Sequence, residues 1–163
     1  MALRKSPDDP KSIELAEAAF VCDFLRVREL LAAGAHPDAR DADERTTIFS
    51  AVLGNSVGVL GLLLEAGADV NARDGHGWTA LHFAASEHLP EVTQILLGSG
   101  ADVNAQDEDG ATPLWRAVQG AHGRSEIIEL LRAKGAKDDI PNNRGETARE
   151  LAERIGDPFF TAN

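Results

Sequence analysis

Only one of the 163 residues is cysteine, so the chain cannot contain an internal disulfide framework. A single thiol is compatible with a reducing compartment, and we therefore expect a cytoplasmic protein. No run of about 18 apolar residues occurs, which argues against a membrane-spanning helix. The N-terminal stretch has no uninterrupted apolar core and carries acids early, so it does not resemble a signal peptide.

Basic residues are also scarce, because 16 Lys and Arg face 27 Asp and Glu, for a formal net charge of -11. Nucleic acids and anionic membrane surfaces both attract clustered positive charge. This charge balance therefore disfavours both as partners. Basic proteins and basic peptides remain compatible with it.

Motifs for catalysis and metal binding are missing too. Neither a G-x-x-x-x-G-K-[ST] phosphate loop nor an H-E-x-x-H pair occurs. No metal-ligand spacing relates the cysteine or the acids to the five histidines His36, His76, His82, His88 and His122. Cys22 would need a neighbouring base to act as a nucleophile, and the alternative is an inert substitute for glycine. We expect no enzyme, no cofactor and no metal; a catalytic or metal-dependent protein is the competing hypothesis.

The sequence does contain a repeat. The hexapeptide GADVNA occurs at 67–72 and again at 100–105, and weaker copies begin at Gly34 and Gly135. The Gly-Ala steps are therefore 33, 33 and 35 residues apart. Self-similarity at such a period predicts stacked repeats, since one helix pair is too small to bury its apolar face alone.

Each repeat predicts a helix, a tight turn, a second helix and a protruding loop. Thr46 and Thr79 are expected to cap first helices, and Asn55 to occupy a turn where a left-handed conformation is tolerable. The second helix of the first repeat is expected to bury an apolar stripe of Leu25, Val27, Leu30 and Leu31. The expected divisions are a flexible arm at 1–12 and one domain at 13–163, with units at about 13–40, 41–73, 74–106, 107–141 and 142–163.

These residues resemble the ankyrin repeat over about residues 13–160. The positions that match in the third unit are Asp74, Gly77, Thr79, Leu81, His82, Ala84, Ala85, Leu96, Leu97, Gly100, Ala101, Asn104 and Ala105. The positions that match in the fourth are Gly110, Thr112, Pro113 and Leu114. The resemblance implies an all-α fold, an ankyrin-repeat solenoid of stacked helix-turn-helix units with protruding β-hairpin-like loops. It is specific for the fold and nearly silent on function.

Departures from the family pattern carry further expectations. His82 matches the family histidine, which bridges neighbouring loops by hydrogen bonds, whereas Phe49 and Trp115 replace it elsewhere. We expect that polar bridge to be missing at both places, and Trp115 to serve packing. Cys22 and His88 replace the turn glycine, so either they adopt a strained positive φ or the turn differs.

The resemblance also implies where a partner binds, because ankyrin proteins usually use their loop tips and the exposed side of the first helices. The register selects Arg40, Asp43, Arg45, Arg73, His76, Trp78, Ser86, Glu87, Glu108, Asp109, Gln119 and Arg144. Trp78 is the favoured anchor, since exposed tryptophans often dominate binding energy. The alternative is that it lies flat over the neighbouring loop.

The expected loops are acidic. Segments 38–45, 69–78, 102–109 and 137–146 hold 13 acidic and five basic residues, and residues 107–109 form the densest run. An acidic rim would speed association with a basic partner. Individual acids can instead satisfy loop backbone amides or keep the array soluble. The fourth unit also has two additional residues within its 119–124 turn, which indicate either a specific contact or simple drift in length.

We therefore expect a monomeric, non-catalytic, intracellular protein–protein interaction module. It would bind a protein with a basic surface through its concave face and acidic loop tips. The alternative function is a dedicated inhibitor, of the immunity type, that neutralises a basic enzyme or toxin. The acidic rim motivates this alternative.

Overall fold

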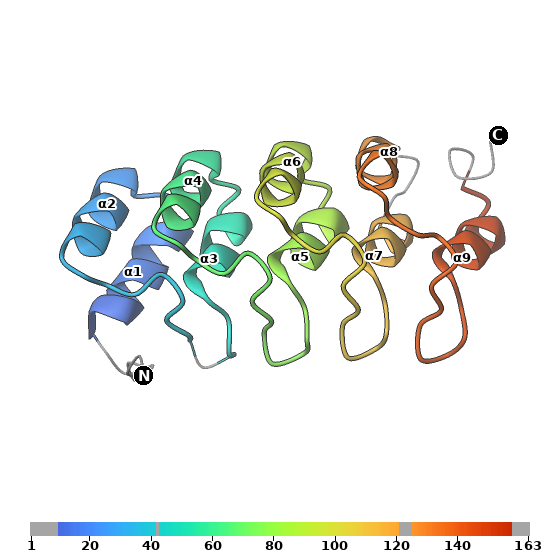
Figure 1. Cartoon of the computed structure of the whole chain (residues 1–163), viewed down its shortest axis with the longest axis horizontal. Helices are drawn as coiled ribbons and strands as arrows, with labels where there is room; N and C mark the ends of the chain where they lie inside the picture. Colours follow the sequence, from blue (N-terminus) through green and yellow to red (C-terminus); the bar gives the residue numbers. More distant parts are fainter. Residues whose placement is uncertain (1–9, 42, 121–124, 158–163) are drawn as a thin grey trace. The chain divides into compact units, whose positions relative to one another are not determined.

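The computed structural model describes residues 10–41, 43–120 and 125–157, which form nine α-helices and no strand (Figure 1). The chain divides into two compact parts, unit 1 at residues 1–75 and unit 2 at residues 76–163. The helices of unit 1 are α1 (Pro10–Phe20), α2 (Phe24–Ala32), α3 (Thr47–Leu53) and α4 (Val57–Glu65). Those of unit 2 are α5 (Ala80–Ser86), α6 (Pro90–Gly98), α7 (Pro113–Gln119), α8 (Glu126–Ala133) and α9 (Ala148–Ile155). The expected all-α helix-turn-helix repeats are confirmed.

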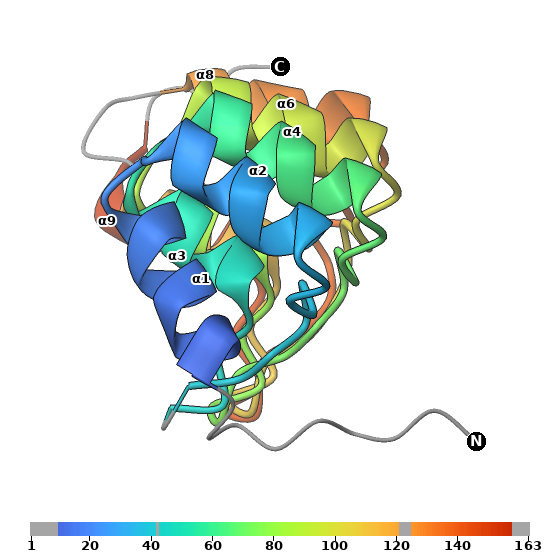
Figure 2. The ribbon, with the colours of Figure 1, turned by 90° about the vertical axis from the view of Figure 1, so that its left-hand side faces the viewer.

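Unit 1 consists of two stacked helix pairs. The first helices α1 and α3 pack together, and the second helices α2 and α4 form the neighbouring layer. Figure 2 shows α1 and α2 side by side at the near end of this unit. The contact between α1 and α3 is lined by fully buried side chains, among them Leu15, Ala19, Ile48 and Ala51. Small alanines let the first helices approach closely, and the leucines supply buried apolar area.

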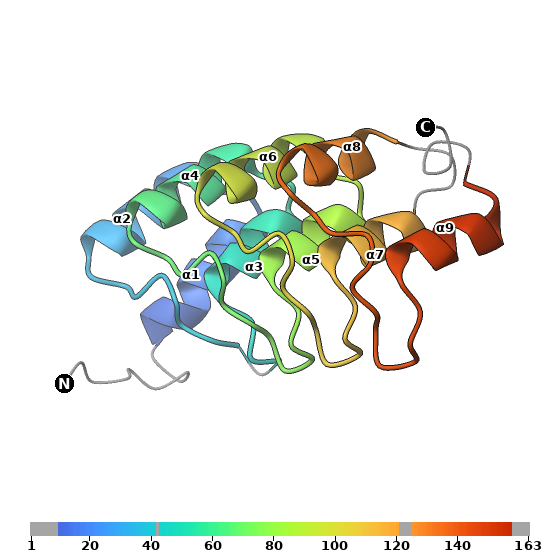
Figure 3. The ribbon, with the colours of Figure 1, turned by 45° about the vertical axis from the view of Figure 1, so that its right-hand side comes forward.

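Unit 2 continues the same pattern, with α5, α7 and α9 in one layer and α6 and α8 in the other. Figure 3 shows the loops that precede α7 and α9 extending away from the layer of second helices. Fully buried residues again include alanines of the first helices and leucines of both layers: Leu81, Ala84, Leu96, Leu114, Ala117 and Leu131. The candidate binding site is built on these loops and first helices.

Threonines at the start of the first helices behave differently in the two units. The Oγ1 of Thr79 accepts the N–H of His82 at 3.4 Å, and the Oγ1 of Thr112 accepts that of Trp115 at 3.2 Å. Thr46 occupies the same N-cap position, but its side chain makes no capping hydrogen bond. Its hydroxyl oxygen is buried and has no hydrogen-bond partner among the described residues. The expected side-chain cap at Thr46 is therefore wrong.

Two expectations about the N-terminal part need correction. Helix α1 begins at Pro10, so residues 10–12 of the expected arm are helical, and Ser12 is buried. Proline is accepted there because the first turn of a helix does not need its N–H. Leu25 was expected in the buried stripe of the second helix, but it is 60% exposed. It precedes the buried Val27 by two residues, which places it on the opposite side of α2.

The tight turns between the helices of a pair contain a residue in the left-handed conformation, although that residue is not glycine. Cys22, Asn55 and His88 follow one another at intervals of 33 residues and have φ values of 59°, 49° and 54°. The turn is therefore retained, and Cys22 and His88 carry the strained conformation. The fourth repeat (107–141) has two additional residues in the turn between its helices. That turn falls largely on residues 121–124, outside the described residues. Single-domain behaviour of residues 13–163 stays a prediction.

Candidate functional site

Three of the loops close on the side chain of their first residue. The Oδ1 of Asp107 accepts the N–H groups of Asp109 at 3.0 Å and Ala111 at 2.9 Å. Asp41 and Asn142 accept equivalent pairs of N–H groups in their own loops, at 2.9 to 3.0 Å. An amide does this work as well as a carboxylate, so the loop needs an acceptor at this position and not a charge. This is the structural role that sequence reasoning left open for the loop acids.

Neighbouring loop tips of unit 2 are tied together through backbone groups. The N–H of Glu108 donates to the carbonyl of His76 at 3.1 Å, and the N–H of Asn143 donates to the carbonyl of Asp109 at 2.8 Å. The side-chain amide of Asn143 also donates to the carbonyl of Glu108 at 2.7 Å. The three tips thus form one ordered row, which we call the tip row (residues 76, 108–109 and 142–145).

An arginine of α7 joins this row to the helices. Arg116 donates from Nε and Nη2 to Oδ2 of Asp107, at 2.9 and 2.6 Å, and from Nη2 to Oδ2 of Asp109 at 2.8 Å. The side chain of Asp107 is fully buried, that of Arg116 is 11% exposed and that of Asp109 is 77% exposed. The Asp107 pair is therefore internal, whereas Asp109 remains at the surface.

The guanidinium of Arg116 also lies close to the rings of two tryptophans. Its central carbon is 4.7 Å from the ring centroid of Trp78 and 5.3 Å from that of Trp115, within the range of cation–π attraction. Trp78 meets Phe83 edge to face at 5.5 Å and lies tilted to His82 at 6.0 Å. Trp78 is consequently half-buried and packed against α5 and α7, while Trp115 is only 8% exposed.

His82 makes the bridge expected of it. Its Nδ1 accepts the backbone N–H of Thr79 at 3.1 Å, so the proton resides on Nε2, which donates to the carbonyl of Ala111 at 3.1 Å. The bridge links α5 to the following loop. Trp115 occupies the corresponding position one repeat later, and its indole N–H finds no acceptor in the described part of the chain. The expected loss of the polar bridge at Trp115 is confirmed.

The structure groups four of the expected site residues around one loop of unit 1. Arg40 donates to the carbonyl of Arg73 at 2.6 Å and to that of Glu44. Arg45 pairs with Asp43 at 3.0 Å. Both arginines thus contribute to internal contacts of the loop.

In unit 2 the expected residues fall on two edges. His76, Glu108, Asp109 and Arg144 lie exposed in the tip row. At the opposite ends of the first helices are Ser86, Glu87 and Gln119, which belong to α5 and α7 or follow them directly. A seven-residue helix is about 10 Å long, so the two ends of each first helix are separated by roughly that distance, and the tip row lies beyond the N-terminal end. Trp78 and Arg116 lie between the edges.

Sequence reasoning missed Arg116 and the buried state of Asp107. One signal was present, because Arg116 is the only Lys or Arg between residues 74 and 123. A lone cation in an acidic stretch, adjacent to a tryptophan, is a candidate for internal pairing. Its partners could not be identified, since Trp78 precedes it by 38 residues.

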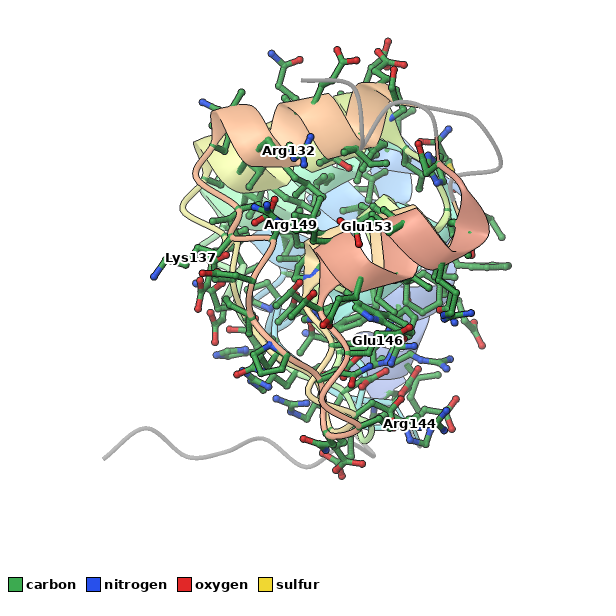
Figure 4. The ribbon with its side chains drawn as sticks, turned by 90° about the vertical axis from the view of Figure 1, so that its right-hand side faces the viewer. Arg132, Lys137, Arg144, Glu146, Arg149 and Glu153 are labelled. Carbon is green, nitrogen blue, oxygen red and sulfur yellow. The ribbon has the colours of Figure 1, made fainter. Side chains whose placement is uncertain are left out.

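Charges at the C-terminal end of unit 2 neutralise one another. Asp138 accepts two hydrogen bonds from Nη2 of Arg149, at 2.9 and 3.0 Å, and pairs with Arg132 at 3.4 Å. Figure 4 shows both arginines on the end of the unit formed by α8 and α9. Burial raises the pKa of Asp138, but the hydrogen bonds and charge of Arg149, aided by Arg132, outweigh it and leave that pKa below its ordinary value. This end of the unit thus carries polar side chains that pair with one another, and a polar outer face is typical of a terminal repeat.

No helix in residues 10–41, 43–120 and 125–157 is both long and apolar enough to cross a membrane. Within the same ranges, no group of three or more His, Cys, Asp or Glu side chains could hold a metal ion.

Comparison with known families agrees with this geometry. A family profile described as ankyrin repeats (3 copies) matches residues 15–107, and one described as ankyrin repeats (many copies) matches residues 87–132. No curated protein matches the chain. The matched residues contain the capped first helices, the bridging histidine and the loops closed by aspartate. The chain belongs to the ankyrin-repeat family.

Proposed function

We propose that this protein binds a basic protein partner through the tip row of unit 2 and the adjoining Trp78, and that it acts without catalysis. Ankyrin repeats are generally protein–protein interaction modules, which supplies the class of function. The observation that supports the location is the ordering of three successive loop tips by backbone hydrogen bonds. A surface that is ordered before binding loses less conformational entropy when the partner arrives.

The charge of this surface favours a basic partner. The carboxylate of Glu108 accepts no hydrogen bond and forms no ion pair with the described residues, and that of Asp109 is mostly exposed. The cation beside Asp109, Arg116, is already engaged by Asp107. Exposed acidic groups therefore dominate the field around Trp78, and such a field raises the association rate with a positively charged protein.

Trp78 supplies the apolar part of the surface. It is half-buried and its ring is held by Arg116 and Phe83, so little rotational freedom remains to be lost on binding. Tryptophans in such settings are frequent binding anchors. The partner would cover the exposed part of the ring while its cations approach Glu108 and Asp109.

A dedicated inhibitor of a basic enzyme is the second candidate, favoured by the same acidic surface. It would bind its target one to one and block turnover, whereas an adaptor would leave the partner active. In both cases we propose a monomer in the cytoplasm, since the unpaired Cys22 is compatible with a reducing compartment.

Affinity capture followed by mass spectrometry tests the proposal. The wild-type chain should retain a basic protein, and binding of that protein in purified form should weaken as salt rises. Glu108→Gln should lower the affinity by about two- to fivefold, because an exposed charge pair is lost. Glu129→Gln removes one charge from α8, outside the tip row, and should leave the affinity unchanged. A partner whose binding ignores salt, Glu108→Gln and Trp78→Ala alike would contradict the proposal.

A further inference from the structure

We infer that Arg116 is a positioning residue of the proposed binding surface: it fixes the orientation of Trp78, the anchor, and does not serve the partner as a charge. This inference rests on the proposed function for the meaning of the surface. The positioning itself is a property of the free protein, so it can be tested without a partner.

The geometry forms a chain of support from the loop to the ring. Two backbone N–H groups fix one carboxylate oxygen of Asp107, and the other oxygen binds Nε and Nη2 of Arg116. Two bonds from a planar guanidinium define its orientation as well as its position. The oriented guanidinium then lies 4.7 Å from the ring centroid of Trp78.

Trp78 contacts side chains from both α5 and α7. It lies in the loop just before α5, where its ring meets the edge of Phe83 and the tilted ring of His82. Arg116 comes from the next first helix, α7, and places a cation against the same ring. Without it, a half-buried indole would gain rotational freedom that binding must remove again.

Charge and positioning predict opposite results for the loss of Arg116. Removing a cation from an acidic surface should, by Coulomb attraction alone, strengthen the binding of a basic ligand. Loss of the positioning contact should weaken it. The sign of the change in affinity therefore separates the two roles.

The probe is a fluorescently labelled nona-arginine peptide, whose binding is followed by anisotropy at constant ionic strength. Arg116→Gln should weaken binding by about fivefold, as loss of one stacked contact allows. The matched control is Arg144→Gln, which removes an exposed cation of the tip row that pairs with no described carboxylate, and should strengthen binding by about twofold. Arg116→Lys keeps the charge and can still pair with Asp107, but lacks the planar fork, so it should weaken binding as well.

A spectroscopic measurement follows Trp78 in the free protein. The chain has two tryptophans and no tyrosine, so Trp115→Phe leaves Trp78 as the sole emitter at long excitation wavelengths. In that background, Arg116→Lys and Arg116→Gln should increase quenching by acrylamide, which is neutral, and shift the emission to the red. Far-UV circular dichroism checks that the helices are retained, and Arg116→Lys covers the case in which Arg116→Gln does not fold.

The outcomes distinguish failure of the positioning role from failure of the proposed basic partner. If Arg116→Gln tightens peptide binding as Arg144→Gln does, or if quenching of Trp78 does not change in either variant, the positioning role is refuted. If the wild-type protein does not bind the peptide, the proposed basic partner fails instead. In that case the quenching experiment alone supports or overturns the inference.

Discussion

Asp107 has two roles: it accepts hydrogen bonds from the loop backbone, and it carries the negative charge that pairs with Arg116. Substitution can separate these roles. Asp107→Asn keeps an oxygen for the N–H groups of Asp109 and Ala111, as Asn142 does in its own loop. It removes the negative charge beside Arg116. Asp107→Ala removes both the charge and the acceptor.

The structure sets the expected magnitudes. Arg116 is 11% exposed, so losing a charged partner should cost more than at a surface pair, although Asp109 remains available to it. We expect Asp107→Asn to lower the free energy of unfolding by about 2 kcal/mol. Asp107→Ala also leaves the N–H of the buried Ala111 without an acceptor, and should lower it by about 4 kcal/mol.

Urea unfolding followed by circular dichroism at 222 nm measures both variants. The variants can be compared only if the free energy of unfolding depends on urea concentration with the same slope as in the wild type. A changed slope would mean that a different number of repeats unfolds together, which can happen in repeat proteins. The double variant Asp107→Asn with Arg116→Met completes a thermodynamic cycle. It should lose about 1–2 kcal/mol less than the sum of the single changes, since neither charge is then left alone.

Two results would refute this reasoning. If Asp107→Asn is as stable as the wild type, the ion pair with Arg116 contributes nothing and the loop acceptor is the whole role. If Asp107→Asn is as damaging as Asp107→Ala, the charge is the whole role and the equivalence with Asn142 is false.

Three further comparisons, which use four substitutions, test other features of the fold. Thr46→Val should raise the free energy of unfolding by about 1 kcal/mol, because it removes a buried hydroxyl without a described partner, whereas Thr112→Val should lower it by about 1 kcal/mol by removing a cap; equal effects in urea unfolding would contradict this. Glu44→Gly should stabilise by about 1 kcal/mol, since Glu44 has a φ of 61° where the later loops place glycine, and a lower urea midpoint would argue against strain there. Asp138→Asn should lower stability at neutral pH and converge with the wild type once the pH falls below the depressed pKa of Asp138, because that carboxylate stabilises the fold only while ionised; thermal midpoints that differ by the same amount at every pH would refute the assignment.

The fold was predictable because its determinants recur. The period of 33 residues, the repeated hexapeptide and the glycines of the loops appear in the sequence itself, and each dictates local backbone geometry. The bridge of His82 followed from the family pattern in the same way. The missing side-chain cap at Thr46 could not be predicted in this way, because the orientation of its side chain depends on the packing around it and not on residue type.

The candidate site was only partly predictable for a related reason. Trp78, Glu108 and Asp109 could be placed by register, since register determines which loop positions face outward. Arg116 joins residues of two successive repeats, and such a contact depends on stacking that no local pattern encodes. Asp107 is also fully buried, although the acidic composition of the loop had suggested that it was exposed.

The ties between the loop tips have a consequence for how this surface changes over time. The bonds from Glu108 to His76 and from Asn143 to Asp109 use main-chain atoms, so replacing the side chains of His76, Glu108 or Asp109 leaves those bonds in place. Natural variation, or selection from a library randomised at these three positions, can therefore exchange one recognised target for another while the supporting scaffold is inherited unchanged.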